Sequence, residues 1–259
     1  MERRKRVQVT MEKNEIFHVH TFRCGHAAEV EDEAYVKKAI ELGADKITFT
    51  DHAPFPGDFF AWRMKCEQLD GYLTSIRGLQ EKYAGRIEVR CGLEIEYLPT
   101  FKNYYEELRA SEAFDVLLLG QHIFEYKPGL WNYEVELSDE VNAMGLFEAQ
   151  IKGLETGYFD VLAHPDRCLQ KMGEWTREMN LDSKELIRVA RERRIPLEKN
   201  LASMESDGMY RKPFWANVGE GDAVIIGYDA HAPEEMERRH RKKMEIEAKY
   251  PVPETGFFH

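Results

Sequence analysis

The chain has 259 residues, of which 43% are hydrophobic, and its formal net charge is −11. This length suits one large domain, and it is close to the roughly 250 residues of a barrel of parallel strands and helices. The acidic balance argues against sequence-independent binding to nucleic acid, which needs a basic surface. It is compatible with a small anionic substrate held through metal ions.

The cysteines and the N-terminal residues narrow the class of protein further. The four cysteines show no CxxC spacing and are Cys24, Cys66, Cys91 and Cys168. Without a signal-peptide pattern, free thiols and a cytoplasmic location are expected. No apolar run approaches the roughly 18 residues of a membrane span. Residues 1–13 are predicted to be a charged, flexible tail before a single domain over 14–259, with a nucleic-acid-binding arm as the alternative.

The first part of the chain alternates between strand-like and helix-like runs. Residues 15–20 (EIFHVH) form the first predicted strand, and a helical pattern follows over 29–44. A second strand is predicted at 45–50. A loop rich in proline and phenylalanine, 53–64, leads to a second helix over 66–84.

The middle of the chain repeats this order. Residues 86–97 (RIEVRCGLEIEY) form the third predicted strand, and 101–110 a short helix. The apolar run 114–124 predicts a buried fourth strand, and 139–156 predicts a helix.

The last part adds three strands and two helices. Strands are predicted at 159–164, 195–200 and 222–231, and helices at 182–194 and 233–250. Repeated strand-then-helix order predicts an α/β fold with a mostly parallel sheet. Periodicity alone leaves open whether this sheet closes into a barrel.

Histidines gather where the predicted strands end. Seven of the nine lie at or just beyond such ends: His18, His20, His26, His52, His122, His164 and His231. In a parallel barrel the C-terminal strand ends form one face, so these side chains are expected to converge. In the HVH segment, residues two apart on a regular strand point the same way, roughly 6.6–6.8 Å apart, and both rings can reach one ion.

Carboxylates accompany these histidines. Asp51 precedes His52, Glu94 lies in the third strand, and Asp229 stands two residues before His231. Imidazole and carboxylate groups are the usual ligands of zinc, iron and manganese, so the pattern predicts a site for several metal ions. A single histidine would more often be an ordinary core or surface residue, but seven at strand ends are not explained in that way.

Three further polar residues stand on the predicted strands or in the loop after the first strand. Cys24 stands in the ligand loop, where packing is a more frequent role for a lone cysteine than metal binding. Glu96 and Glu198 could either support ligands or be plain strand positions.

The segments HVHTFRCGH, TDH, GLEIEY, GQH, AHPD and YDAH, in this order, resemble the PHP (polymerase and histidinol phosphatase) superfamily over residues 16–231. The HTxxCxH opening, Arg63-Met64 and GLEIEY are most similar to the PHP-type histidinol-phosphate phosphatases. This resemblance implies a distorted, TIM-like barrel of seven parallel strands and helices.

The resemblance also implies a trinuclear centre of zinc, iron or manganese. His18, His20, Glu94 and Asp229 would hold the first ion; Glu94 would bridge to the second, held also by His122 and His164; His26, His52 and His231 would hold the third.

The reaction implied is hydrolysis of L-histidinol phosphate to L-histidinol and phosphate, a step of histidine biosynthesis. In our hypothesis a metal-bound hydroxide attacks phosphorus, Glu94 bridges two ions, and Asp51 orients a ligand from behind. The alternatives are a PHP enzyme acting on another small phosphate ester, on nucleotides or on nucleic acid, and a non-catalytic metal-binding domain. The sequence does not indicate an oligomeric state.

Basic and aromatic residues in the loops are candidates for binding the substrate. Candidates for the phosphate are Arg63, Arg211, Arg167 and Lys171. Phe59, Phe60 and Trp62 could form a lid, or could simply pack over the rim. The chain departs from the family pattern at Tyr228 and Arg167, and in the shortened GQH segment. We expect Tyr228 and Arg167 to alter the rim beside the metals, and therefore the choice of substrate.

Overall fold

Seven parallel strands form the centre of the molecule in the computed structural model, which describes residues 14–249. The tail predicted for residues 1–13 lies outside the described residues. The strands are β1 (Glu15–Val19), β2 (Lys46–His52), β3 (Glu88–Ile95), β4 (Val116–Leu119), β7 (Val161–Leu162), β8 (Leu197–Asn200) and β9 (Val224–Gly227). All seven strands are parallel, as the alternating pattern of the sequence predicts, and they follow one another around the sheet in chain order.

The sheet curls into a nearly closed barrel, because its two outermost strands meet. An isolated parallel bridge joins Val19, at the end of β1, to Ala230, just beyond β9. Backbone hydrogen bonds support this seam, from Tyr228 N to Phe17 O (2.7 Å) and from His20 N to Ala230 O (2.9 Å). The barrel implied by the family resemblance is therefore confirmed.

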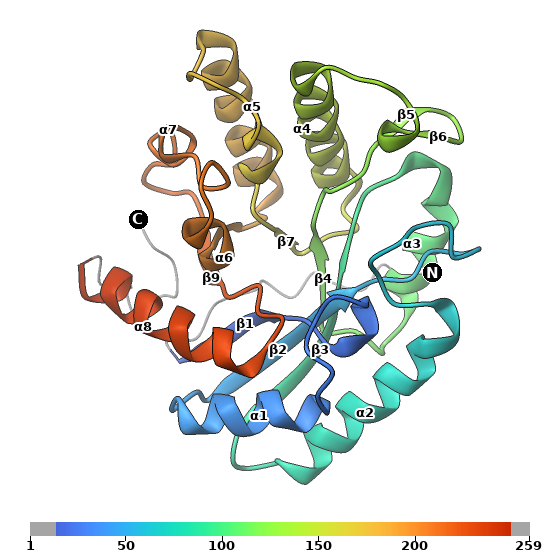
Figure 1. Ribbon diagram of the computed structural model, residues 1–259, viewed down its shortest axis with the longest axis vertical. Coiled ribbons are helices and arrows are strands. Elements are labelled where there is room, and N and C mark those ends of the chain that lie inside the picture. Colours follow the sequence, from blue (N-terminus) through green and yellow to red (C-terminus); the bar gives the residue numbers. More distant parts are fainter. Residues whose placement is uncertain (1–13, 250–259) are drawn as a thin grey trace.

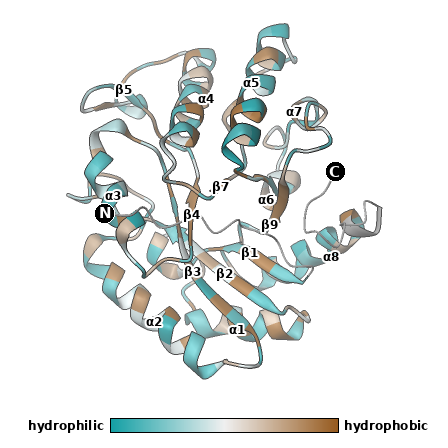
Figure 2. Cartoon of the chain, turned by 180° about the vertical axis from the view of Figure 1, so that it is seen from behind, coloured by the Kyte–Doolittle hydropathy of each residue, from teal (hydrophilic) through white to brown (hydrophobic). Residues whose placement is uncertain are grey.

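Helices surround the strands on the outside of the barrel (Figure 1). They are α1 (Asp32–Glu41), α2 (Leu69–Lys82), α3 (Lys102–Ala110), α4 (Asp139–Thr156), α5 (Arg177–Arg193), α6 (Leu201–Glu205), α7 (Lys212–Trp215) and α8 (Pro233–Lys249). Figure 2 shows strands β4 and β9 as largely hydrophobic, whereas α2 and α4 alternate between the two hydropathy extremes. Apolar side chains such as Tyr35, Ile76 and Leu186 point from the helices into a core from which water is excluded.

Helix α4 has the bounds that the sequence predicts, because both of its ends carry local signals. The Ser138 side chain accepts a hydrogen bond from Val141 N (3.2 Å) at the first turn. Gly157 ends the helix in the left-handed conformation, with φ of 80°.

Other elements differ from the prediction. Helix α5 begins five residues before the predicted start at residue 182, because Thr176 caps it by accepting from Met179 N. The antiparallel hairpin of β5 (Glu125–Lys127) and β6 (Leu130–Trp131), and the short helices α6 and α7, were not predicted. Each is too short to produce a periodic pattern. Over residues 14–249, no helix is both long and apolar enough to cross a membrane.

Candidate metal centre

The nine predicted ligands meet at the C-terminal end of the barrel. They come from the ends of six strands, β1, β2, β3, β4, β7 and β9, or from the loops that follow them. The ring centroids of His20 and His231 are 4.1 Å apart, those of His20 and His52 4.4 Å, and those of His122 and His164 5.0 Å. Segments more than 200 residues apart in the chain therefore form one cluster, because the parallel barrel aligns its strand ends.

The backbone is strained at three of these positions. His18, His164 and Asp229 have positive φ values of 69°, 28° and 51°, which non-glycine residues seldom adopt. The expectation of a regular strand through the HVH segment is wrong, because the pairing of β1 with β2 shifts register between Phe17 and Val19. This bulge re-aims His18, and its Nε2 still lies 3.0 Å from His20 Nε2. Such strain is characteristic of functional sites.

Glu94, at the end of β3, lies at the middle of the cluster and is almost completely buried. Five imidazoles surround its two carboxylate oxygens. Oε2 lies near His18 Nε2 (3.2 Å), His20 Nε2 (3.4 Å) and His52 Nδ1 (3.3 Å), and Oε1 near His164 Nε2 (2.8 Å) and His122 Nε2 (3.8 Å). A side chain at Gly120 would overlap the Glu94 carboxylate, so the neighbouring strand leaves room for it.

A second group forms beside Asp229. Asp229 Oδ1 lies 3.4 Å from His20 Nε2 and 3.6 Å from His231 Nδ1. His26, His52 and His231 can each place one nitrogen within 4.8 Å of the others. The same geometric relation holds for His18, His20 and Glu94, and for His52, Glu94 and His122.

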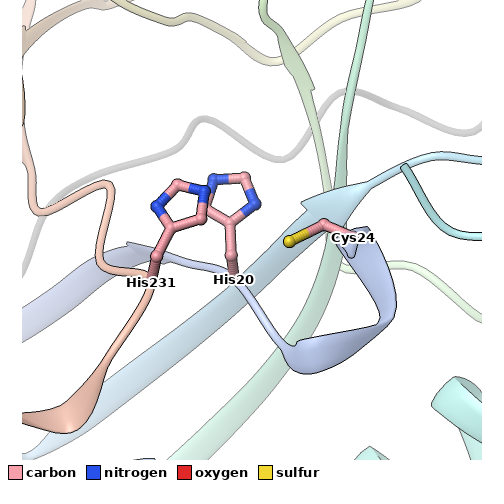
Figure 3. A group of neighbouring side chains, drawn as sticks. All are labelled: His20, Cys24 and His231. Carbon is pink, nitrogen blue, oxygen red and sulfur yellow. The ribbon is translucent and has the colours of Figure 1, made fainter. Parts of the chain in front are cut away.

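Cys24 stands next to this cluster on the turn that follows β1 (Figure 3). Its sulfur points toward the ring of His20, which is stacked on His231 with an angle of 12° between the planes. Burial raises the pKa of the Cys24 thiol to about 12, and the charge of Asp51 adds to the effect. The thiol is therefore neutral near pH 7 in the absence of metal, and its sulfur lies within 4.8 Å of a ring nitrogen of both His20 and His231.

Three carboxylates contact the outer nitrogens of the imidazoles. Glu198 Oε1 lies 2.6 Å from His18 Nδ1, Glu96 Oε1 lies 3.2 Å from His122 Nδ1, and Asp51 Oδ1 lies 3.5 Å from His20 Nδ1. The sequence left Glu96 and Glu198 open between a supporting role and a plain strand position. Their contacts place them behind the candidate ligands, where such groups fix ring orientation and tautomer.

The charges of the cluster shift its pKa values in opposite directions. Burial acts to lower the pKa of His20, but the carboxylates of Asp229 and Asp51, 3.4 and 3.5 Å from its ring nitrogens, outweigh it and raise the pKa to about 9. Burial lowers the pKa of His164 to about 4 and that of His231 to about 3. Burial would raise the pKa of Glu94, yet the nearby His18 and His52 hold it well below its usual value. The Glu94 carboxylate therefore stays ionised and attracts positive charge.

The four basic residues predicted for the phosphate fall into two pairs. Arg63 and Arg167 line the cavity above the cluster, and Arg211 and Lys171 do not. Arg211 instead donates to the carbonyl oxygens of Met172 and Gly173. The side chain of Lys171 is 67% exposed and pairs with a surface aspartate. The structure therefore does not bring Arg211 and Lys171 to the lining of this cavity.

Arg63 and Arg167, the two predicted arginines that line the cavity, are each held by a carboxylate. Arg63 makes a bidentate pair with Glu96, at 2.9 and 3.0 Å. Arg167 Nη2 donates to Asp229 Oδ2 (2.6 Å) and to Asn200 Oδ1 (2.9 Å). Nη1 of Arg167 has no hydrogen-bond partner among residues 14–249, so Arg167 keeps one donor group for a ligand.

Three charged residues on α6 and α8 also line the cavity, and the sequence did not predict them: Glu205, Arg238 and Arg239. Arg239 is buried beside the centre and donates to the backbone oxygens of Tyr228 (3.1 Å) and Asp229 (2.6 Å). Together with Arg238 and Glu205 it lines the cavity. Because α8 is highly charged, its sequence predicts that Arg239 faces solvent. However, α8 follows β9 directly, so the first turns of α8 lie beside the C-terminal end of the barrel.

Tyr228 does not lie at the rim, contrary to expectation. It is fully buried, and its hydroxyl is 2.8 Å from Nδ1 of His240 on α8. Residues alternate between the two faces of a strand, so the residue before Asp229 points outward, toward the helix layer.

A cavity of about 930 Å³ opens above the cluster. Its lining includes Glu94, Asp229 and the imidazoles of His26, His52, His122 and His231. On one side it is bounded by Phe59, Phe60, Trp62 and Tyr133. Of the three residues considered for a lid, Phe60 is buried among other aromatic rings, whereas Phe59 and Trp62 are 65% and 70% exposed. The cavity is large enough for a small phosphate ester.

Residues 17–202 match the PHP domain family. A protein of Deinococcus radiodurans, named probable histidinol-phosphatase, is 29% identical over 238 residues, which are 85% of this chain and 86% of the relative. The histidinol-phosphatase of Bacillus subtilis is 34% identical over 92 residues, 33% of this chain and 34% of the relative.

Solved structures show a similar fold. The crystal structure of the histidinol phosphate phosphatase from Lactococcus lactis, complexed with zinc, L-histidinol and phosphate, superimposes with a TM-score of 0.65 and 18% identity. The match covers 88% of this chain and 93% of that one. A crystal structure from Listeria monocytogenes gives a TM-score of 0.73, also at 18% identity, and covers 88% of this chain and 99% of that one.

Proposed function

The chain belongs to the PHP domain family, and on that premise we propose that it is a metal-dependent phosphatase that hydrolyses L-histidinol phosphate to L-histidinol and phosphate. The observation that carries the proposal is the buried Glu94 carboxylate, surrounded by imidazoles at the floor of an open cavity. The names of the relatives from Deinococcus radiodurans and Bacillus subtilis support the substrate.

The donor set fits divalent ions. His18, His20, Glu94 and Asp229 would hold the first ion, Glu94, His122 and His164 the second, and His26, His52 and His231 the third. The mixture of imidazole and carboxylate groups suits zinc, iron and manganese. Nε2 of His231 is buried and has no hydrogen-bond partner among the described residues, as expected of a nitrogen placed for a metal ion.

Ions bound there would neutralise the phosphate oxygens and supply Lewis acidity for attack by water. The residues of the chain prepare the site for them. Glu198 holds Nδ1 of His18, and Glu96 holds Nδ1 of His122, so that the opposite nitrogens face Glu94. The Asp51 carboxylate, which contacts the Thr21 hydroxyl and accepts from His52 N, lies 3.5 Å from Nδ1 of His20 without a direct hydrogen bond, and its charge favours this position of the ring.

Arg167 is the candidate for direct contact with the phosphate. Its Nη2 and Nε groups are held by Asp229, Asn200 and Ser203, and this leaves Nη1 for a phosphate oxygen. A guanidinium fixed in this way binds an anion without first losing rotamer freedom. Arg63 lines the same cavity, but both ends of its guanidinium pair with Glu96. Arg63 therefore acts through Glu96 on His122.

The proposal is tested by phosphate release from L-histidinol phosphate, compared with other small phosphate esters, a nucleotide and single-stranded DNA. Metal content is measured on the same sample. We expect a strong preference for L-histidinol phosphate and about three ions per chain. A preference for another ester would contradict the substrate and leave the hydrolase intact. A metal-loaded protein that hydrolyses none of these substrates would favour a non-catalytic metal-binding domain.

A further inference from the structure

Three large aromatic side chains face solvent at the mouth of the cavity. Phe59, Trp62 and Tyr133 are 65%, 70% and 56% exposed, and all three line the cavity above the candidate metal centre. Exposed aromatic rings gathered around a concave site mark a surface on which an apolar part of a ligand is placed. We shall call these three residues the aromatic wall.

The aromatic wall adjoins the ions' proposed positions. Trp62 meets the ring of His26 edge to face, with 6.1 Å between centroids. His26 belongs to the group proposed to hold the third ion. A substrate whose phosphate reaches the metal centre would therefore have the rest of its structure beside Trp62.

Buried aromatic packing around Phe60 supports the aromatic wall. Phe60 is buried and packs against Phe55 (5.1 Å) and Trp131 (5.0 Å), and it also contacts the ring of Tyr133 edge to face. The Arg63 guanidinium lies over the ring of Phe60, 5.3 Å from its centroid. The two segments that carry the wall, after β2 and after β6, are thus joined through Phe60.

The backbone of the loop also fixes the wall. Trp62 has a positive φ of 57°, and Gly57 a φ of 92°. A side chain at Gly57 would overlap the ring of Phe59, so this ring lies directly against the glycine. A non-glycine residue in the left-handed region persists only where the surroundings hold it there. The exposed rings are therefore positioned before any ligand arrives.

We propose that the aromatic wall is the subsite for the planar ring of the substrate's alcohol, and that it determines specificity. This inference rests on the proposed function and deepens it, since the alcohol of L-histidinol phosphate carries an imidazole. A planar ring, neutral or protonated, gains from stacking or edge contacts with Trp, Tyr and Phe. An ester without a ring gains nothing from the wall and uses only the metal centre and the arginines.

The experiment compares two esters on the metal-loaded, full-length protein. L-Histidinol phosphate carries a phosphate, an ammonium group and a ring; O-phosphoethanolamine carries the first two only. We expect Trp62→Ala to lower kcat/KM for L-histidinol phosphate about tenfold, mostly through KM. The value for O-phosphoethanolamine should change less than about twofold, because no stacking contact is lost. Trp62→Phe should restore most of the loss.

Tyr126→Ala is the matched control, since Tyr126 is an aromatic residue that is 41% exposed but does not line this cavity. It should leave both esters unaffected. Equal losses for the two esters in Trp62→Ala would mean that the loop only supports the metal centre, and would overturn the inference. Unchanged values for both esters would overturn it as well.

Binding of the product separates this inference from the proposed function. Titration calorimetry with L-histidinol and phosphate should show a weaker Kd for Trp62→Ala than for the wild type or Tyr126→Ala. If the wild type does not hydrolyse L-histidinol phosphate, the proposed function fails. Phenyl phosphate then replaces L-histidinol phosphate in the comparison with O-phosphoethanolamine. A loss confined to phenyl phosphate would still support the ring subsite, and no such loss would refute it.

Discussion

The two ends of the barrel are both polar inside, but they balance their charges differently. At the N-terminal end, Lys46 is buried and its Nζ lies 3.5 Å from a carboxylate oxygen of Glu88. Thr48 donates to Glu15 there, at 2.7 Å. At this end the Lys46 ammonium contacts a carboxylate, and the Glu15 carboxylate accepts a hydrogen bond from a neutral hydroxyl.

At the C-terminal end, carboxylates are matched mostly by histidines. Arg63 pairs with Glu96 and Arg167 with Asp229. Asp51, Glu94 and Glu198 are also buried, and among residues 14–249 no lysine or arginine forms an ion pair with them. Their partners are imidazoles, whose ring nitrogens can release a proton to solvent and bind a metal ion instead. The N-terminal end therefore pairs its buried charge with other groups of the chain, whereas the rim leaves buried carboxylates that lack a lysine or arginine partner.

Removal of Glu94 should have the largest effect on turnover and on metal content. Glu94→Ala takes away the carboxylate that five imidazoles surround, and we expect turnover to fall by about a thousandfold or more, with loss of bound metal. The measurements are kcat and metal content. Glu88→Ala, at the opposite end, is the control and should keep both. Near-normal turnover of Glu94→Ala would refute the proposed centre.

Crowding of the rim by one methyl group should have the next largest effect. A side chain at Gly227 would overlap the Glu198 carboxylate that holds His18. For Gly227→Ala we expect kcat to fall by about 100-fold, because a small displacement of catalytic groups is costly. Steady-state kinetics measure the change in kcat, and thermal melting measures the change in stability. Gly71→Ala, in α2 where an added Cβ meets nothing within 4 Å, should instead stabilise the fold by about 0.5–1 kcal/mol. Equal behaviour of the two variants would contradict the clash.

Glu198→Gln changes only the charge behind His18. We expect metal affinity to fall by about 10- to 100-fold, as is typical when such a supporting carboxylate is lost. A competition assay with a chelating dye reads this directly. Glu15→Gln, in the N-terminal end, provides the comparison and should leave metal affinity unchanged. An unaltered affinity in Glu198→Gln would show that His18 needs no support.

Tyr228→Phe should have the smallest effect and tests the correction made by the structure. It removes the hydroxyl that contacts His240, so we expect a loss of stability of about 1 kcal/mol and no change in substrate preference. Denaturant unfolding and the ester panel provide the measurements. A changed substrate preference would contradict the conclusion that Tyr228 lies away from the rim.

The sequence predicted parallel strands with histidines and carboxylates at their ends, but not the geometry of the rim that these residues form. The bounds of α4 follow from Ser138 and Gly157, which are signals within the helix's own termini. The start of α5 was missed, because its cap, Thr176, precedes any regular apolar pattern. The hairpin of β5 and β6 is too short to produce a periodic pattern, and Trp131 at its end packs against Phe60 of the loop after β2.

The sequence by itself determined that imidazoles and carboxylates follow the ends of parallel strands, because side-chain chemistry and the alternation of strand and helix are local properties. Three features depend on the folded barrel. His18 lies on a bulge of β1. Glu198 and Glu96 contact the outer nitrogens of His18 and His122, and Arg211 donates to the carbonyl oxygen of Met172 instead of lining the cavity. These contacts join residues 26 to 180 positions apart. They depend on how the barrel closes, and no pattern within a single segment contains that information.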